Sequence, residues 1–165
     1  MLIQDFIANS PESERANAAI ARMNYLHSLY RKSGKISNGD LLYTLALFAL
    51  EPKNWINRYE WRKLTDLEIC ALGTFWKSIG DAMEISYEEL PGSTEGWKDG
   101  IQWIDEVAKW SEAYEKKYMV SHQDNKKTAD ETTAMLLYDA PSSLHPVGFK
   151  VVSALMDGRL RKAMM

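Results

Sequence analysis

A lone histidine on an apolar helix face is the residue of this sequence best placed to do chemistry. At about 100° per residue, Ile20, Met23, His27 and Tyr30 fall on one stripe of a helix, so His27 is predicted to face inward. A neutral imidazole in that position can bind a metal or a heme iron. It can also be a hydrogen-bonded core residue, which on spacing alone is the commoner role.

Other familiar chemistries lack their residues. His122 lies in a polar stretch and His145 precedes a proline, so surface roles are expected for both. The Glu-x-x-His pairs of carboxylate-bridged di-iron bundles are absent, as are His-Glu-x-x-His, a phosphate-binding glycine loop and Gly-x-Ser-x-Gly. These absences leave His27 as the principal candidate.

The elements that must position His27 are helical almost throughout. Caps, glycines and prolines predict helices from Ser10–Pro11 to Gly34, Ser37–Asn38 to Glu51–Pro52, Pro52 to Trp61, Thr65 to Met83, Lys98 to Tyr118, Thr128 to Pro141, and from Ser142 or Ser143 onward with a break at Asp157–Gly158. No strand-period alternation interrupts them. We therefore predict an all-α fold, an irregular bundle of about six to eight helices, with Trp76, Trp103 and Trp110 buried.

Composition indicates an ordinary globular chain. A hydrophobic content of 45% and a net charge of −3 argue against disorder, and 20 basic against 23 acidic residues give no basic surface for nucleic acid. Cys70 is the single cysteine, so no internal disulfide forms, and no signal peptide is visible. The longest apolar run, Leu41 to Leu50, is far shorter than the roughly 20 residues that span a bilayer. We expect a single intracellular domain over residues 1–165.

The histidine stretch, Arg22-Met-Asn24-Tyr-Leu-His27-Ser-Leu-Tyr-Arg31, resembles the signature of a heme-dependent oxygenase family. That family includes latex-clearing proteins (rubber oxygenases) and a fungal endoplasmic-reticulum-bound oxygenase of mycophenolic acid biosynthesis. Bacterial members read Arg-x-Arg-x-x-His-x-x-x-Arg, so Asn24 stands where they have the second arginine. Further blocks agree in order: Lys35–Asn38 with Asp40, Phe48–Pro52, Arg58–Arg62, Phe75–Met83, Trp110–Tyr114, Thr128–Asp130, Leu137–Asp139, and Leu155–Asp157 with Arg159.

The resemblance implies a cofactor, a reaction and a location. It implies heme b with His27 as the axial ligand and with Arg31 and Lys77 as partners of the heme propionates. It further implies dioxygen and a hydrophobic, isoprenoid-like substrate whose carbon–carbon double bond is oxidatively cleaved. The location it implies is the cytoplasm or the endoplasmic reticulum membrane, with membrane attachment only through an anchor outside this chain.

Each proposed cation also has a plainer reading. Arg31 can face solvent or a surface carboxylate, and Lys77 can neutralise an acidic neighbour. Lys77 shares its helix stripe with Gly73 and Gly80, and two glycines on one stripe suggest the close approach of another helix or, less commonly, of a flat macrocycle.

Family catalytic domains are longer than this chain, so we expect either a fragment or a reduced form of such a domain. The alternative function is a non-catalytic helical remnant that serves as an interaction module. The final segment keeps an apolar pattern to its end, at Leu155, Met156, Leu160 and Met164, which predicts self-association as a homodimer.

Overall fold

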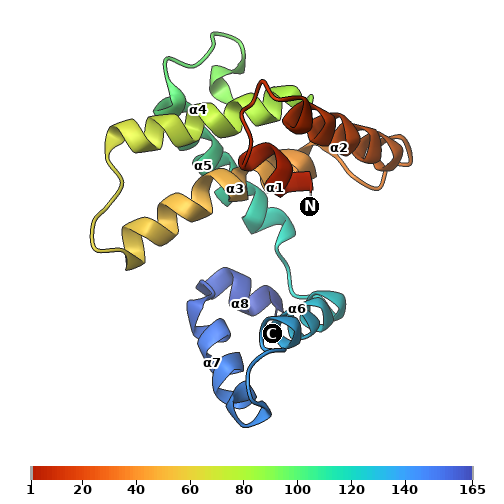
Figure 1. The fold of residues 1–165 in the computed structure, drawn as a ribbon, viewed down its shortest axis with the longest axis vertical. Helices are drawn as coiled ribbons and strands as arrows, with labels where there is room; N and C mark the ends of the chain where they lie inside the picture. Colours follow the sequence, from red (N-terminus) through yellow and green to blue (C-terminus); the bar gives the residue numbers. More distant parts are fainter. Residues whose placement is uncertain (1, 165) are drawn as a thin grey trace. The chain divides into compact units, whose positions relative to one another are not determined.

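The computed structural model describes residues 2–164, and over that range it contains eight α helices, two short 3₁₀ turns and no β strand (Figure 1). The all-α prediction is confirmed. The helices are α1 Leu2–Ile7, α2 Glu14–Lys32, α3 Asn38–Tyr59, α4 Asp66–Ala82, α5 Gly100–Tyr118, α6 Gln123–Leu136, α7 His145–Leu155 and α8 Gly158–Met164, with 3₁₀ turns at Pro91–Ser93 and Ser142–Leu144.

The chain divides into two compact units, residues 1–111 and 112–165, and the boundary falls inside α5. The single-domain organisation stays a prediction. All six tryptophans lie in the first unit, which also carries His27.

The core of the first unit is built from the inward faces of its helices. Helix α1 packs on α2, and α3 packs on α4. Trp103, Ile104 and Val107 of α5 are fully buried, and Trp76 of α4 is nearly so. Burial of Trp76 and Trp103 confirms two of the three tryptophan predictions. Trp110 is only half-buried, because its indole nitrogen reaches outward to donate a 3.0 Å hydrogen bond to Glu89.

Two capping boxes begin α3 and α4 where the sequence predicts them. The Ser37 hydroxyl accepts from the Asp40 amide, while the Asp40 carboxylate accepts from the Ser37 amide. Thr65 and Glu68 form the same reciprocal pair at α4, and Arg62 adds two hydrogen bonds to the Glu68 carboxylate. These boxes satisfy amides that a helix start would otherwise leave without partners.

Three predicted helix boundaries are wrong. Helix α3 continues through Pro52 to Tyr59, so the two predicted helices are one. Helix α2 begins after Ser13 rather than at Ser10, because the Ser13 hydroxyl accepts from the Ala16 amide. Helix α6 begins at Gln123, where the His122 imidazole serves as the N-cap.

Gly73 and Gly100 mark the closest approach of two helices. A Cβ atom on Gly73 would overlap the backbone carbonyl of Gly100, and one on Gly100 would overlap the Cys70 carbonyl oxygen. Gly80 instead lies against Tyr87 and Leu45. Contact with another helix therefore explains the glycine at position 73, as the favoured reading of the sequence expects.

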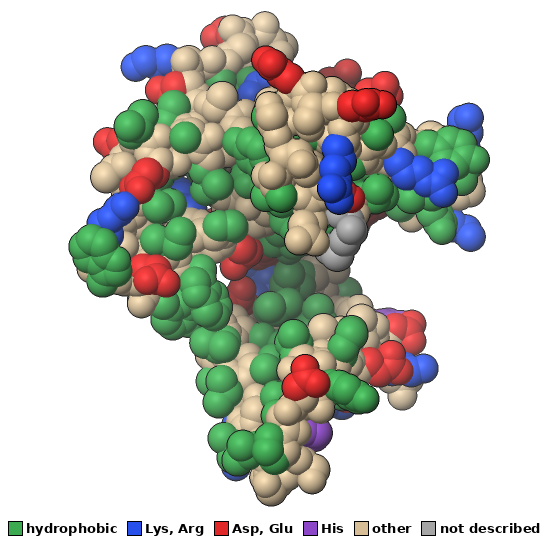
Figure 2. All heavy atoms as spheres, viewed as in Figure 1, with side chains coloured by type: hydrophobic (Ala, Val, Ile, Leu, Met, Phe, Trp, Pro, Cys, Tyr) green, Lys and Arg blue, Asp and Glu red, His purple; other side chains and the backbone are tan. Residues whose placement is uncertain are grey.

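The second unit has little buried apolar surface of its own. Helix α6 packs on α7 and α8, and Arg159 pairs with Glu115 at 2.7 Å. The buried residues of its described part are Thr133 and Ala163, whereas Met135, Leu136 and Tyr138 are each at least 70% exposed. Figure 2 shows hydrophobic side chains over the face of this unit that carries α7.

Candidate functional site

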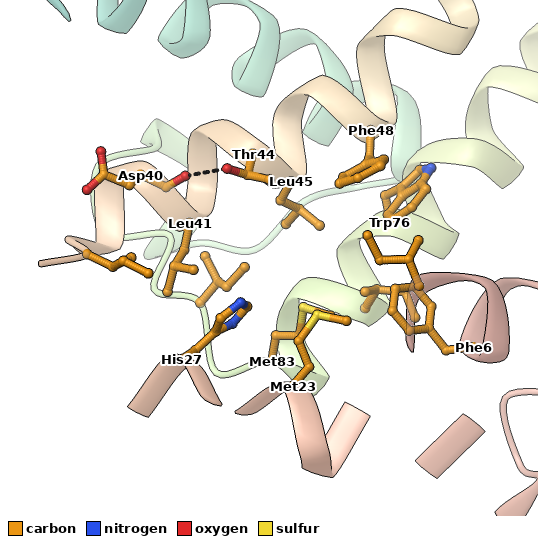
Figure 3. Close-up of a pocket in the computed structure, with 14 residues that line it drawn as sticks. Phe6, Met23, His27, Asp40, Leu41, Thr44, Leu45, Phe48, Trp76 and Met83 are labelled. Carbon is orange, nitrogen blue, oxygen red and sulfur yellow. Dashed lines mark hydrogen bonds between the residues drawn. The ribbon is translucent and has the colours of Figure 1, made fainter. Parts of the chain in front are cut away.

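A cavity of about 380 Å³ opens in the first unit between α1, α2, α3 and α4 (Figure 3). Its size falls within the roughly 300–1,000 Å³ typical of small-molecule sites. The lining is mostly aliphatic, aromatic and thioether side chains: Ile3, Phe6, Met23, His27, Ile36, Asp40, Leu41, Thr44, Leu45, Phe48, Trp76, Ile79, Met83 and Ile85. Phe48 stacks on Trp76 with ring centroids 5.2 Å apart and forms one end of the wall.

His27 is the one histidine in this cavity, and its imidazole points toward the lining of α3 and α4 (Figure 3). Its Nδ1 atom is buried without a hydrogen-bond partner among the described residues. Burial lowers the pKa of His27, and the nearby Arg31 cation lowers the pKa further. The ring is therefore neutral near pH 7, the form in which imidazole binds metals.

The segment that follows α4 contributes Met83 and Ile85 to the cavity wall, and polar side chains of α2 and α3 fix its position. Asn24 Nδ2 donates to the Ala82 carbonyl at 2.8 Å. The Asn38 side chain exchanges two hydrogen bonds with the Ser86 backbone, at 2.8 and 2.9 Å. Local spacing in the sequence does not predict these bonds, because the two partners lie 48 residues apart along the chain.

Glu84 adopts a left-handed backbone conformation in that segment. Its φ is 57°, and the Ile85 amide donates back to Gly80 O at 3.0 Å, as in a Schellman helix end. Arg31 Nη1 lies 3.5 Å from the Glu84 carbonyl oxygen, so Arg31 sits beside the cavity without lining it.

Lys77 lies apart from His27 in the first unit. Its ammonium group pairs with Asp81 at 2.8 Å and lies over the rings of Tyr87 and Trp97, at 5.4 and 5.3 Å from the centroids. It does not line the cavity. The structure thus brings His27 and Arg31 to one place, while Lys77 has an acidic neighbour, as its plainer reading expects.

The donor set suits a heme better than a protein-ligated metal ion. No group of three or more His, Cys, Asp or Glu side chains gathers anywhere in residues 2–164. A heme iron needs only one or two axial ligands, because the macrocycle supplies the others. A single neutral imidazole on the wall of an apolar cavity fits that requirement.

The fold and the cavity define an all-α protein with a single histidine in an apolar pocket. Comparison with known proteins identifies homologues. "ER-bound oxygenase mpaB′" of Penicillium brevicompactum is 56% identical over 164 residues, 99% of this chain and 39% of that protein. "ER-bound oxygenase mpaB" of Penicillium roqueforti (strain FM164) is 55% identical over 164 residues, 99% of this chain and 55% of that protein.

The chain is therefore homologous, over nearly its whole length, to part of the fungal ER-bound oxygenases mpaB. This confirms the resemblance that the histidine stretch indicates. The chain spans about half the length, or less, of these relatives. No family model matches it, and no solved structure matches it. Although the relatives are named ER-bound, none of the described helices is both long and apolar enough to span a bilayer.

Proposed function

We propose that this chain forms the histidine side of a heme b pocket in an oxygenase. The observation that carries the proposal is the neutral His27 imidazole on the wall of an apolar cavity of about 380 Å³. The homology to proteins named oxygenases supports it independently.

In this proposal His27 supplies the axial nitrogen, and bound heme supplies the activation of dioxygen. Arg31, whose guanidinium lies beside the cavity, would pair with a propionate through its fork of donors. Phe48 and Trp76 would exclude water from the pocket. Lys77 forms an ion pair with Asp81, and we assign Lys77 no part in holding the cofactor.

The apolar lining favours a hydrophobic substrate. We propose oxidative cleavage of a carbon–carbon double bond in an isoprenoid-like molecule, at the endoplasmic reticulum membrane. Because the relatives are longer, we propose that the complete reaction also needs residues outside these 165, including those that attach the protein to the membrane.

A heme titration tests the pocket. Purified chain should give a Soret band on adding hemin, with one heme bound per chain. His27→Ala should abolish that band or shift it, while far-ultraviolet circular dichroism stays helical. His122→Ala and His145→Ala are matched controls and should bind as the native chain does. Loss of the band in either control, with His27→Ala unaffected, would refute the assignment.

A second candidate function is an interaction module that has lost the cofactor. The exposed apolar side chains of the 112–165 unit favour it, among them Met135, Leu136 and Tyr138. Light scattering of the purified chain would then show a homodimer, and the hemin titration would show no specific band. A monomer that binds heme would refute this second candidate and support the heme pocket.

A further inference from the structure

Two buried polar atoms on one face of α2 have no hydrogen-bond partner within residues 2–164. They are Oδ1 of Asn24 and Nδ1 of His27. Residues three apart on a helix are neighbours, with Cβ atoms about 5–6 Å from each other. Buried polar atoms in folded proteins are nearly always hydrogen-bonded, so two adjacent exceptions call for a shared explanation.

The orientation of the Asn24 amide is determined by its other end. Nδ2 donates to the Ala82 carbonyl oxygen at 2.8 Å, and reversing the amide would place two oxygens against each other. Oδ1 is therefore an acceptor that needs a donor. Arg31, the charged neighbour of His27, carries donors only and cannot accept a hydrogen bond from the imidazole. The Asp40 carboxylate accepts from the amide and hydroxyl of Ser37.

We propose that Asn24 is a positioning residue: a small rotation of the two neighbouring side chains lets Asn24 Oδ1 accept a hydrogen bond from Nδ1–H of His27. This bond fixes the neutral ring in the Nδ1–H tautomer and leaves the lone pair on Nε2. The same side chain ties the ring to the end of α4 through Ala82.

The consequence for heme rests on the proposed function. A metal-binding histidine commonly donates its second ring nitrogen to an outer partner, which orients the ring and makes the bound nitrogen more basic. Asn24 would be that partner for His27. The hydrogen bond itself belongs to the protein without cofactor, so it can be tested even if heme never binds.

His145 provides an internal contrast. His145 Nε2 lies 3.0 Å from the Ala140 carbonyl oxygen, which requires a proton on Nε2 in the neutral ring. His122 Nδ1 lies 3.2 Å from the Asp124 amide and 3.3 Å from the Asp124 carboxylate, so it does not serve as a second reference. His27 and His145 should therefore carry opposite tautomers.

Long-range ¹H–¹⁵N spectra of the heme-free chain, above the pKa of all three rings, decide the point. His27, assigned by loss of its signals in His27→Ala, should show a pyrrole-type Nδ1 and a pyridine-type Nε2. Asn24→Ala should at least halve the Nδ1–H population. Asn24→Asp keeps an acceptor but loses the donor to Ala82, so it should retain the Nδ1–H tautomer.

Asn17→Ala is the matched control, because Asn17 is an exposed asparagine of α2 whose amide donates to Ser13 O. It should leave the His27 signals unchanged. An Nε2–H tautomer at His27 in the native chain would overturn the proposal, and so would an Nδ1–H population that Asn24→Ala does not change. If the tautomer pattern is as expected but hemin gives no specific band, only the proposed function fails.

Discussion

Replacing Gly73 by alanine should destabilise the first unit, although alanine is the better helix former. A Cβ atom at position 73 meets the backbone of Gly100, which cannot rotate away as a flexible side chain would. The change therefore forces α4 and α5 apart. It should also disturb the cavity wall, because Trp76 and Ile79 lie on α4 and line that cavity.

The expected magnitude is the difference between two opposing effects. Alanine in place of a helical glycine gains about 1 kcal/mol of helix stability. Overpacking a close contact costs typically about 1–3 kcal/mol and more where backbone must move. With backbone as the obstacle we expect a net loss of about 2 kcal/mol, or roughly 1 M in the urea midpoint for a domain of this size.

Urea unfolding followed by tryptophan fluorescence measures this loss in the relevant part of the molecule, because all six tryptophans lie in residues 1–111. Ser78→Ala is the matched control, since Ser78 is an exposed residue of the same helix; it should leave stability unchanged or raise it slightly. Gly100→Ala should be destabilising too, and the double variant should cost less than the sum. A Gly73→Ala chain as stable as the control would refute the close-packing argument.

The remaining predictions concern three glutamates. Hydrogen bonds from Arg62 and Thr65 lower the pKa of Glu68 from 4.5 to about 2, so its stabilising contribution is complete above pH 4.5 and is lost as the pH falls toward 2; acid unfolding of Glu68→Gln should lack that part of the pH dependence. Glu84→Gly should raise the midpoint of thermal unfolding, because glycine adopts the observed φ of 57° without a Cβ penalty; a lower midpoint would show that the Glu84 side chain itself stabilises the turn. The Glu106 carboxylate accepts from the Gly92 amide at 2.7 Å and from Trp97 Nε1 at 2.9 Å, so Glu106→Ala should lose about 2 kcal/mol of stability in urea and change the Trp97 emission, whereas an unchanged midpoint would mean that water replaces both bonds.

Local signals in the sequence predicted local structure well. The capping boxes at Ser37 and Thr65 form as expected, since each needs only residues three apart. The prediction that a helix ends at Pro52 is wrong: proline disfavours a helical predecessor, yet α3 continues through Pro52 to Tyr59. The start of α6 was predicted too late, because histidine is an uncommon N-cap and the polar stretch around His122 is typical of a loop.

The sequence pointed to His27 of the candidate site but not to the side chains that hold the segment after α4. Helical periodicity and the family-like motif both pointed to His27, which lines the cavity. Asn24 and Asn38 hold the segment after α4 through partners 58 and 48 residues distant, and no spacing rule reveals such pairs. The proposed role of Lys77 came from resemblance and helix register, neither of which could show that Asp81, one turn away, would pair with it.

The cavity walls have a consequence for how the chain folds. All of the lining residues fall between positions 3 and 85, on α1 to α4 and the segments that adjoin them. During synthesis this stretch can collapse as it leaves the ribosome, before the helices of the second unit are made. The pocket around His27 would then be an early product of folding, available to a cofactor while the rest of the polypeptide is still being translated.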